Sequence, residues 1–384
     1  MKAWIRAHAL DLAVIAAGLC LAVALRASLL EFKSGDYYHY TKEWYNTLKA
    51  EGFAAFRRDF SNYNLPYLYL LYAVVRFLPD LSPVVAIKIP AMVADFVSAW
   101  LVFQIVHQKF RSNFLPLLAA FSVLVAPTLV LNSAFWGQAD AVYTTFLLAS
   151  LLCLVKGRGA IAMAAFGLAL AFKAQSLFLV PLLGALILRR EIRLRTVLWI
   201  PLVFFLTLIP AWLAGRPFAE LLLIYPAQAG QYGQLSMHAP SALAWIPDTG
   251  RYFGYFQASA LVLAAAAAVA YVWAVFRSPS RLTPALLVEL ALIAAVLMPF
   301  CLPKMHERYF YLADELSIAL AFFVPSLFYV PVLMICISFF AYQPALFGAE
   351  PVPMGVLALG VLVVIIVLLR HALPRLLAPA ADQR

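Results

Sequence analysis

Long apolar stretches, separated by short clusters of charged residues, occupy most of this chain of 384 residues. A helix needs about 20 apolar residues to cross the hydrocarbon core of a bilayer, and several of the stretches reach that length. The pattern therefore predicts an all-α bundle of about twelve transmembrane helices. The predicted spans are residues 9–30, 84–106, 114–131, 141–155, two short spans within 160–188, 197–213, 257–276, 286–302, 311–329, 331–346 and 354–370.

Clusters of Lys and Arg between these stretches set the predicted orientation, because short cytoplasmic loops carry an excess of both residues. Lys2 and Arg6 predict a cytoplasmic amino terminus, and Arg370 and Arg375 predict a cytoplasmic carboxyl terminus. Residues 9–30 lack a small-residue cleavage site, so we expect a retained anchor. The other clusters predicted to be cytoplasmic are Lys109 with Arg111, Lys156 with Arg158, residues 189–195, and Arg277 with Arg281.

We expect a single membrane domain over residues 1–384, with two long external loops and C-terminal spans within 311–384. The first loop, residues 31–83, contains three amphipathic pieces, at 37–48, 53–60 and 65–78. The last of them is apolar but short, which predicts an interfacial or re-entrant helix. The second loop covers residues 214–256.

Residues 160–188 are too long for one span and too short for two ordinary spans. Charge clusters on both flanks require two crossings, so we expect the helix to break at residues 172–176. Two short helices would then meet at Lys173. Broken helices are tolerated in membranes where they line a cavity within the protein.

The composition supports the membrane assignment. Apolar residues make up 65% of the chain and charged residues 12%, against roughly half and a quarter in soluble proteins. The net charge of +10 is explained by Lys and Arg in the predicted cytoplasmic loops, where they would attract anionic lipid. No nucleic-acid partner is therefore expected. The four cysteines fall in apolar stretches, and no metal-ligand spacing or glycine-rich phosphate loop is evident, so no metal or cofactor is predicted.

Five polar clusters fall on the predicted outer side of the bundle. Ionisable groups at a membrane edge are costly, so each is a hypothesis of function by default. The clusters are Asp36, residues 136–140, Lys173 with Gln175, residues 231–238, and residues 304–308.

Asp36 follows the first apolar stretch and opens the aromatic-rich first loop. One interpretation is a solvated loop acid beside Lys33. The other is a general base, because a sugar hydroxyl is a poor nucleophile until a positioned carboxylate accepts its proton. Tyr37 adjoins this acid and is a candidate contact for the sugar or the acceptor.

Lys304, His306, Glu307 and Arg308 lie within five positions, directly after an apolar span. They are either an interfacial anchor or a clamp for a departing phosphate, which fixed cations can stabilise without a metal. In the second case Glu307 would orient Arg308 or His306.

The remaining candidates have two interpretations as well. Lys173 either pairs with a buried acid, Asp95 or Asp140, or contacts a phosphate or a sugar hydroxyl. Asp95 itself is expected to be structural. Residues 136–140 offer an aromatic face, an amide and a carboxylate, the mixture that binds sugars, although Trp136 alone would also suit an aromatic belt. The candidate sugar or acceptor contacts are Trp136, Gln138, Asp140, Gln175, Glu307 and Tyr37.

Several short motifs, in this order along the chain, resemble the type C glycosyltransferases, integral-membrane enzymes. The opening resembles the asparagine-linked-glycosylation glucosyltransferases that use dolichyl-phosphate glucose, and the later pieces look like their bacterial relatives. The resemblance covers roughly residues 10 to 320. The motifs are Gly35-Asp36-Tyr37, Trp44, Asn64-Leu65-Pro66-Tyr67, Lys88, Ala94-Asp95, Trp136-Gly137-Gln138-Ala139-Asp140, Phe172-Lys173-Ala174-Gln175 and Pro303-Lys304-Met305-His306-Glu307-Arg308-Tyr309.

The resemblance implies a fold, a reaction and roles for particular residues. It implies that Asp36 is the base, that His306 and Glu307 face the active cavity, and that the reaction inverts the anomeric centre without a metal on the non-cytoplasmic side. Lys304 and Arg308, which flank the histidine, depart from the eukaryotic pattern and leave the donor sugar and the acceptor open.

The sequence thus predicts a transferase that moves a hexose, glucose or mannose, from a polyprenyl-phosphate donor to a hydroxyl of a glycan or glycolipid acceptor. Lys304, His306, Arg308 and Lys173 are the candidates for binding the donor phosphate. Short loops and alanine-rich spans suggest a bacterial inner membrane with the site facing the periplasm. The alternatives are a transporter or flippase of a lipid-linked sugar, and a ligase or polymerase that moves a whole glycan from a diphosphate carrier.

Overall fold

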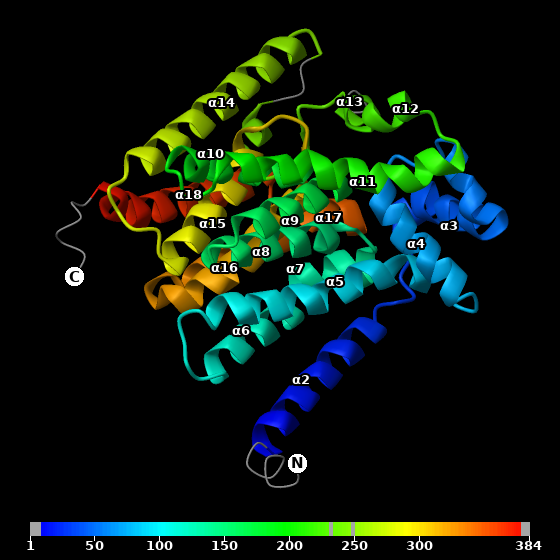
Figure 1. Ribbon diagram of the computed structural model, residues 1–384, viewed down its shortest axis with the longest axis horizontal. Coiled ribbons are helices and arrows are strands. Elements are labelled where there is room, and N and C mark those ends of the chain that lie inside the picture. The colour runs from blue at the N-terminus through cyan, green and yellow to red at the C-terminus, as the bar shows by residue number, and fades with distance from the viewer. Residues whose placement is uncertain (1–8, 230–232, 247–249, 378–384) are drawn as a thin grey trace.

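The computed structural model describes residues 9–229, 233–246 and 250–377, and these are overwhelmingly helical (Figure 1). A single two-stranded parallel sheet occurs in the described part, between β1 (Ser236–Met237) and β2 (Met305–His306). The α-helices are α2 (Ala9–Ala27), α3 (Lys42–Glu51), α4 (Leu65–Phe77), α5 (Pro83–Val106), α6 (Phe114–Val125), α7 (Pro127–Val130), α8 (Asp140–Val155), α9 (Gly159–Phe172), α10 (Val180–Leu188), α11 (Trp199–Ala214), α12 (Phe218–Leu222), α13 (Ile224–Ala229), α14 (Phe253–Arg277), α15 (Pro284–Cys301), α16 (Tyr311–Phe323), α17 (Tyr329–Phe347) and α18 (Met354–Leu377).

The helices begin where local chemistry favours a start. Asn64 caps α4 by accepting a hydrogen bond from the Leu65 N–H, and Thr283 caps α15 by accepting from the Leu286 N–H. Proline, which lacks an N–H and is therefore tolerated in a first turn, follows each cap. The caps fix where each helix begins, although the apolar stretches alone already indicate that both helices exist.

The membrane class is confirmed, but the predicted number of spans is not. Six described helices are long and apolar enough to cross a bilayer, or seven if the bent pair 114–125 and 127–136 forms one span. The other apolar helices have 10–17 residues, and a helix of that length rises only about 15–26 Å. The total of about twelve spans and the cytoplasmic placement of both termini remain predictions.

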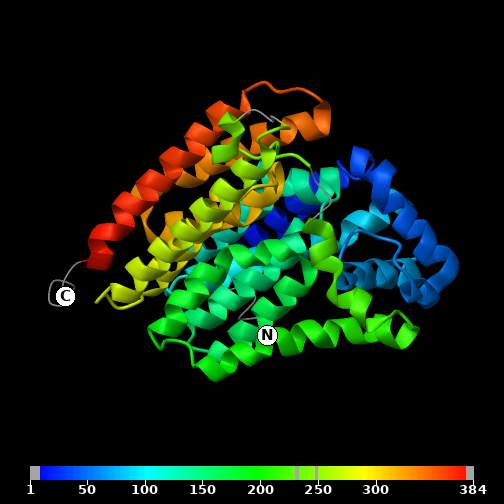
Figure 2. The ribbon, with the colours of Figure 1, turned by 90° about the horizontal axis from the view of Figure 1, so that it is seen from above.

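The helical pieces expected in the first loop are present, and the external placement of the loop remains a prediction. Its pieces are a π-helical turn η1 (Tyr37–Thr41) that continues into α3, a 3₁₀ turn η2 (Gly52–Arg57), and α4. Figures 1 and 2 both place this segment, drawn in blue and light blue, at one end of the bundle. Trp44, Tyr63 and Tyr67 pack there as an aromatic cluster, with ring centroids 4.9–6.5 Å apart.

The core and the periphery differ in burial. Over the apolar window of α15, 83% of the residues are buried, against 11% in the span that contains α11 and 22% in α14. Apolar side chains left exposed on α11 and α14 are the surface expected of helices that face lipid. The core therefore centres on α15 and its neighbours, while α11 and α14 form an outer layer.

The predictions for Asp95 and for the helix break at Lys173 are both confirmed. Asp95 is structural: it is fully buried, forms a 2.7 Å ion pair with Arg26, and also accepts hydrogen bonds from Ser133 and Tyr311. The helix break also occurs where it was expected. α9 ends at Phe172, Lys173 is extended at φ −150°, and a 3₁₀ turn, η4 (Ala174–Leu179), leads into α10.

Candidate active site

Asp36 stands at the start of η1, half-buried, with its carboxylate held by two side chains from residues a hundred positions away. Trp136 Nε1 donates to Asp36 Oδ2 at 2.9 Å, and Gln138 Nε2 donates to the same oxygen at 2.5 Å. Both hydrogen bonds end on one oxygen, and Oδ1 accepts none from the side chains of the described residues. The carboxylate is therefore fixed in place while one oxygen keeps its lone pairs for a proton, which is the arrangement that a general base requires.

A tight turn brings Trp136 and Gln138 to this acid. The π-helical turn η3 (Leu131–Trp136) ends at Gly137, which has φ +83°, and the Gly137 and Gln138 N–H groups both donate to the Asn132 carbonyl. A Cβ atom at position 137 would lie 3.3 Å from Lys88 Cγ. Glycine therefore meets two requirements here, a left-handed backbone and a close approach.

Lys88, which packs against Gly137, also holds the segment that leads to Asp36. Its buried ammonium donates to the carbonyls of Leu29, Leu30 and Phe32, the segment that leads from α2 to Asp36. The same side chain thus holds the segment that follows α2 and packs against Gly137, so it supports both Asp36 and the turn that carries its two partners.

Asp140 is the second centre of the site. It is fully buried at the start of α8 and pairs with Lys173 Nζ at 2.8 Å and with Arg308 Nε at 3.7 Å. Asn132 also donates to it at 3.2 Å. Of the two interpretations of Lys173, the pairing with a buried acid is confirmed, with Asp140 rather than Asp95 as the partner.

Residues 304–308 reach the site through a strained connection. Lys304 has φ +61° and donates its N–H to the Leu235 carbonyl at 2.7 Å, and β2 then pairs with β1. His238, which bridges to His306, also has a positive φ, of +59°. Left-handed backbone is uncommon outside glycine and is often found at functional sites. Residues 231–232 of the predicted polar cluster 231–238 lie outside the described part of the chain.

Arg308 contacts both the 304–308 segment and Trp136. Its guanidinium donates to Glu307 Oε1 at 2.7 Å, approaches His306 Nδ1 at 3.3 Å, and lies 5.5 Å from the ring centroid of Trp136. Trp136 in turn holds Asp36. The Trp136 indole therefore contacts both the candidate base and Arg308.

The ionisation of this cluster follows from burial and charge. Burial opposes the ionisation of Glu307, but the adjacent Arg308 and His306 outweigh it and hold the pKa of that carboxyl at about 2. Burial, reinforced by the positive charge of Arg308, lowers the pKa of His306 below its ordinary 6.5. At neutral pH Glu307 is therefore an anion and His306 is mainly neutral.

A cavity of about 450 Å³ opens beside this cluster. Of the sequence-predicted residues, Lys173, Gln175, Lys304 and Arg308 line it, while Phe172, Leu261 and Leu302 supply apolar wall. Three cations against the carboxylates of Asp140 and Glu307 leave one unit of positive charge around the space. A pocket with a cationic floor and an apolar wall suits an anion attached to a hydrocarbon.

The other predicted residues lie behind the cavity wall. Asp36 does not line the cavity, but Gln138 links it to Tyr63, which does: the Tyr63 hydroxyl donates to Gln138 Oε1 at 3.0 Å. Tyr37 is buried and packs edge-on against Tyr38, and the structure shows no contact between it and the cavity. The remaining members, Trp136, Asp140, His306 and Glu307, are buried and do not line the cavity.

Sequence reasoning missed several cavity residues. Tyr63 contacts Gln138 and places its ring 5.2 Å from Lys173 Nζ. Gln228 and Gln257 come from the second loop and from the start of α14. The run Ser61-Asn62-Tyr63-Asn64 was a weak signal, since it is polar and precedes a capped helix. Nothing local marks the two glutamines.

Comparisons with known proteins show which fold the chain shares. No family model and no curated protein matches the chain. Two solved structures of ArnT from Cupriavidus metallidurans match over 95% of this chain and 74% of theirs, at 14% identity. The TM-score is 0.57 for ArnT bound to undecaprenyl phosphate and 0.54 for the apo state. ArnT is a membrane glycosyltransferase of the type C superfamily.

The chain has the type C glycosyltransferase fold. The resemblance that the short motifs indicated is thus confirmed at the level of the whole architecture, with the all-α class and the membrane location.

Proposed function

We propose that this protein is a glycosyltransferase that moves a hexose, glucose or mannose, from a polyprenyl-phosphate donor to a hydroxyl of a lipid-linked or cell-envelope glycan. The type C fold and the match to ArnT bound to undecaprenyl phosphate support a lipid-phosphate donor. The observation that carries the proposal is the placement of Asp36: a carboxylate with one free oxygen is fixed one indole ring away from the Arg308 cluster and its cavity.

In this reaction Asp36 accepts the proton of the acceptor hydroxyl as its oxygen attacks the anomeric carbon. A new carbon–oxygen bond forms, the bond from the anomeric carbon to the phosphate oxygen breaks, and polyprenyl phosphate leaves with the electron pair. Attack in line with the departing group inverts the anomeric centre. Asp36 is left protonated and returns its proton to water.

Lys304 and Arg308 bind the leaving phosphate, and Lys173 lies beside them in the cavity wall. Their charges are fixed before the reaction, so they stabilise the developing dianion without reorganising. Asp140 and Glu307 hold Lys173 and Arg308 at the distances given above, which assigns them positioning roles. His306, mainly neutral, shapes this side of the site.

The sugar itself would lie between the phosphate and Asp36. Gln175 lines the cavity and offers an amide to sugar hydroxyls, while Trp136 and Gln138 lie behind the cavity wall and hold Asp36. Asp140 and Glu307 then act mainly by positioning Lys173 and Arg308 rather than by binding the sugar. Tyr37 shapes the loop around Asp36. We place the site on the periplasmic face of a bacterial inner membrane.

Transfer of radiolabelled sugar from polyprenyl phosphate in proteoliposomes tests the proposal. We expect labelled acceptor in wild type and a loss of at least about 100-fold in kcat for Asp36→Asn, which keeps the shape but cannot accept the proton. Asp80→Asn, an exposed acid in the same loop, is the matched control and should retain activity. Undiminished turnover in Asp36→Asn would remove Asp36 as the base.

The same assay separates the enzyme from its main alternative. A flippase would move intact lipid-linked sugar across the bilayer without breaking the bond to phosphate. Appearance of label in the acceptor, with release of free polyprenyl phosphate, supports the transferase. Label that only changes leaflet while it stays on the lipid would contradict it.

A further inference from the structure

A second cavity, of about 680 Å³, lies at the opposite end of α9 from the candidate active site. α9 ends beside Lys173 and begins at Gly159 in the second cavity, and its 14 residues rise about 21 Å. The cavity is lined by the first turn of α9 together with Arg158, Glu191, Arg193, Arg195, Thr196 and Trp199. Its size is within the range of ligand-binding pockets.

Three arginines dominate this second cavity. None of the guanidinium groups of Arg158, Arg193 and Arg195 forms a hydrogen bond or ion pair with another residue in the described ranges. Glu191, the single acid on the wall, faces Arg189 at 3.9 Å. Arginine presents a planar set of donors that matches phosphate oxygens, so three guanidiniums without protein partners around one space favour an anionic, phosphate-like ligand.

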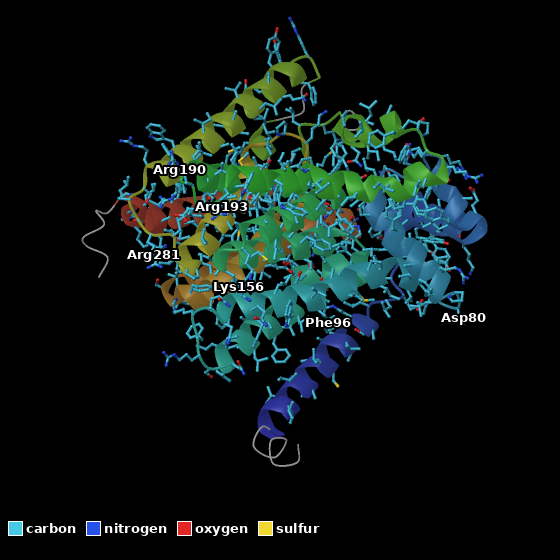
Figure 3. The ribbon with its side chains drawn as sticks, viewed as in Figure 1. Asp80, Phe96, Lys156, Arg190, Arg193 and Arg281 are labelled. Atoms are coloured by element: carbon cyan, nitrogen blue, oxygen red, sulfur yellow. The ribbon has the colours of Figure 1, made fainter. Side chains whose placement is uncertain are left out.

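The backbone adds donors to the same wall. The N–H groups of Gly159, Ala160 and Ile161 belong to the first turn of α9 and have no acceptor within the helix. They line the cavity, where the positive end of the helix dipole adds to the charge of the arginines. In Figure 3 the labels of Arg193 and Arg190 lie close together, and Asp80 is labelled toward the opposite end of the molecule.

An apolar surface adjoins the arginines. Leu194 and Leu198 leave 72% and 70% of their surface exposed, and Trp199, which lines the cavity, exposes 44%. These residues lead into α11, the least buried of the long apolar helices. Tryptophan is typical of the boundary between water and lipid. A free phosphate compound would use the arginines alone, whereas a phospholipid would use the arginines and cover the leucines.

We propose that Arg158, Arg193 and Arg195 form a binding site for the phosphate head group of an anionic phospholipid, with its acyl chains against Leu194 and Leu198. Basic pockets between membrane helices are known to hold anionic head groups. The site is separate from the cavity at Lys173, and the proposal does not depend on the transferase reaction.

Native mass spectrometry of the full-length protein, titrated with phosphatidylglycerol, tests this site. We expect one phosphatidylglycerol to bind at least about tenfold more tightly than phosphatidylcholine with the same acyl chains. The triple variant Arg158→Gln/Arg193→Gln/Arg195→Gln should lose that preference. The matched control, Arg76→Gln/Arg111→Gln/Arg370→Gln, removes three exposed arginines elsewhere and should keep it.

Two further measurements separate lost lipid binding from lost folding and from binding of the phosphate alone. Arg158→Lys/Arg193→Lys/Arg195→Lys keeps the charge and should retain part of the preference, which separates lost binding from lost folding. Glycerol 3-phosphate supplies the head group without acyl chains and should bind far more weakly than the lipid. Equal losses in the two glutamine triples, or equal affinity for glycerol 3-phosphate and phosphatidylglycerol, would overturn the proposal.

Discussion

At the scale of single residues, the site depends on which charges are already paired. Arg308 and Lys173 both face Asp140, and Arg308 also binds Glu307, so the two cations are held in place by carboxylates before any ligand arrives. The acid and the basic turn that contribute to the candidate site were both evident in the sequence. The sequence did not indicate their partners, because Asp36 and Trp136 are 100 positions apart and no local period relates them.

Glu307 should make stability depend on pH. Its pKa is about 2 in the folded protein against 4.5 as an ordinary glutamate, so its contribution is complete above about pH 4.5 and is lost as pH falls toward 2. We expect the thermal midpoint in detergent to fall more steeply between pH 5 and 3 in wild type than in Glu307→Gln. Glu43→Gln, at an exposed position, should keep the wild-type slope. Identical slopes in all three proteins would contradict the coupling of Glu307 to Arg308.

The cations predict how the enzyme responds to chelators. Lys304, Arg308 and Lys173 together supply the positive charge that a leaving phosphate needs. Initial rates of sugar transfer should therefore be the same with and without EDTA. A clear loss of rate that a divalent ion restores would show that the three side chains are not sufficient.

At the scale of elements, breaks in helices build the site more than the helices themselves. The end of α9 at Lys173, the turn at Gly137 and the left-handed Lys304 each bring a side chain inward. The first of these was predictable, because the length between two charge clusters required a break. The other two were not, since the sequence around Gly137 does not reveal that Lys88 packs beneath it.

Gly137→Ala tests the importance of that turn. The left-handed backbone should cost about 1–2 kcal/mol with alanine, and the new Cβ must displace Lys88, which shifts Trp136 and Gln138 away from Asp36. Gly348→Ala is the matched control, because Gly348 is also left-handed but faces open space. We expect both variants to lose stability and only Gly137→Ala to lose kcat. Equal kcat in the two variants would show that the turn does not set the position of Asp36.

At the scale of the whole molecule, the all-helical membrane class follows from the apolar pattern. The count of about twelve spans stays a prediction, because α8, α9 and the 174–188 segment are shorter than the 18 residues of the shortest long apolar helix. Short helices are possible here because neighbouring helices, rather than lipid, surround them. The second loop was the least predictable region, since its cavity residues Tyr225 and Gln228 have no pattern that distinguishes them from ordinary loop residues.

An experimental structure with a bound polyprenyl-phosphate sugar tests the central claim most directly. We predict that the phosphate lies in the cavity within hydrogen-bonding distance of Lys304 or Arg308, with the polyprenyl chain leaving along the apolar wall at Leu261. The sugar should then direct the far face of its anomeric carbon toward the Asp36 carboxylate. A donor whose phosphate lies outside this cavity, or whose anomeric carbon directs another face toward Asp36, would contradict the account.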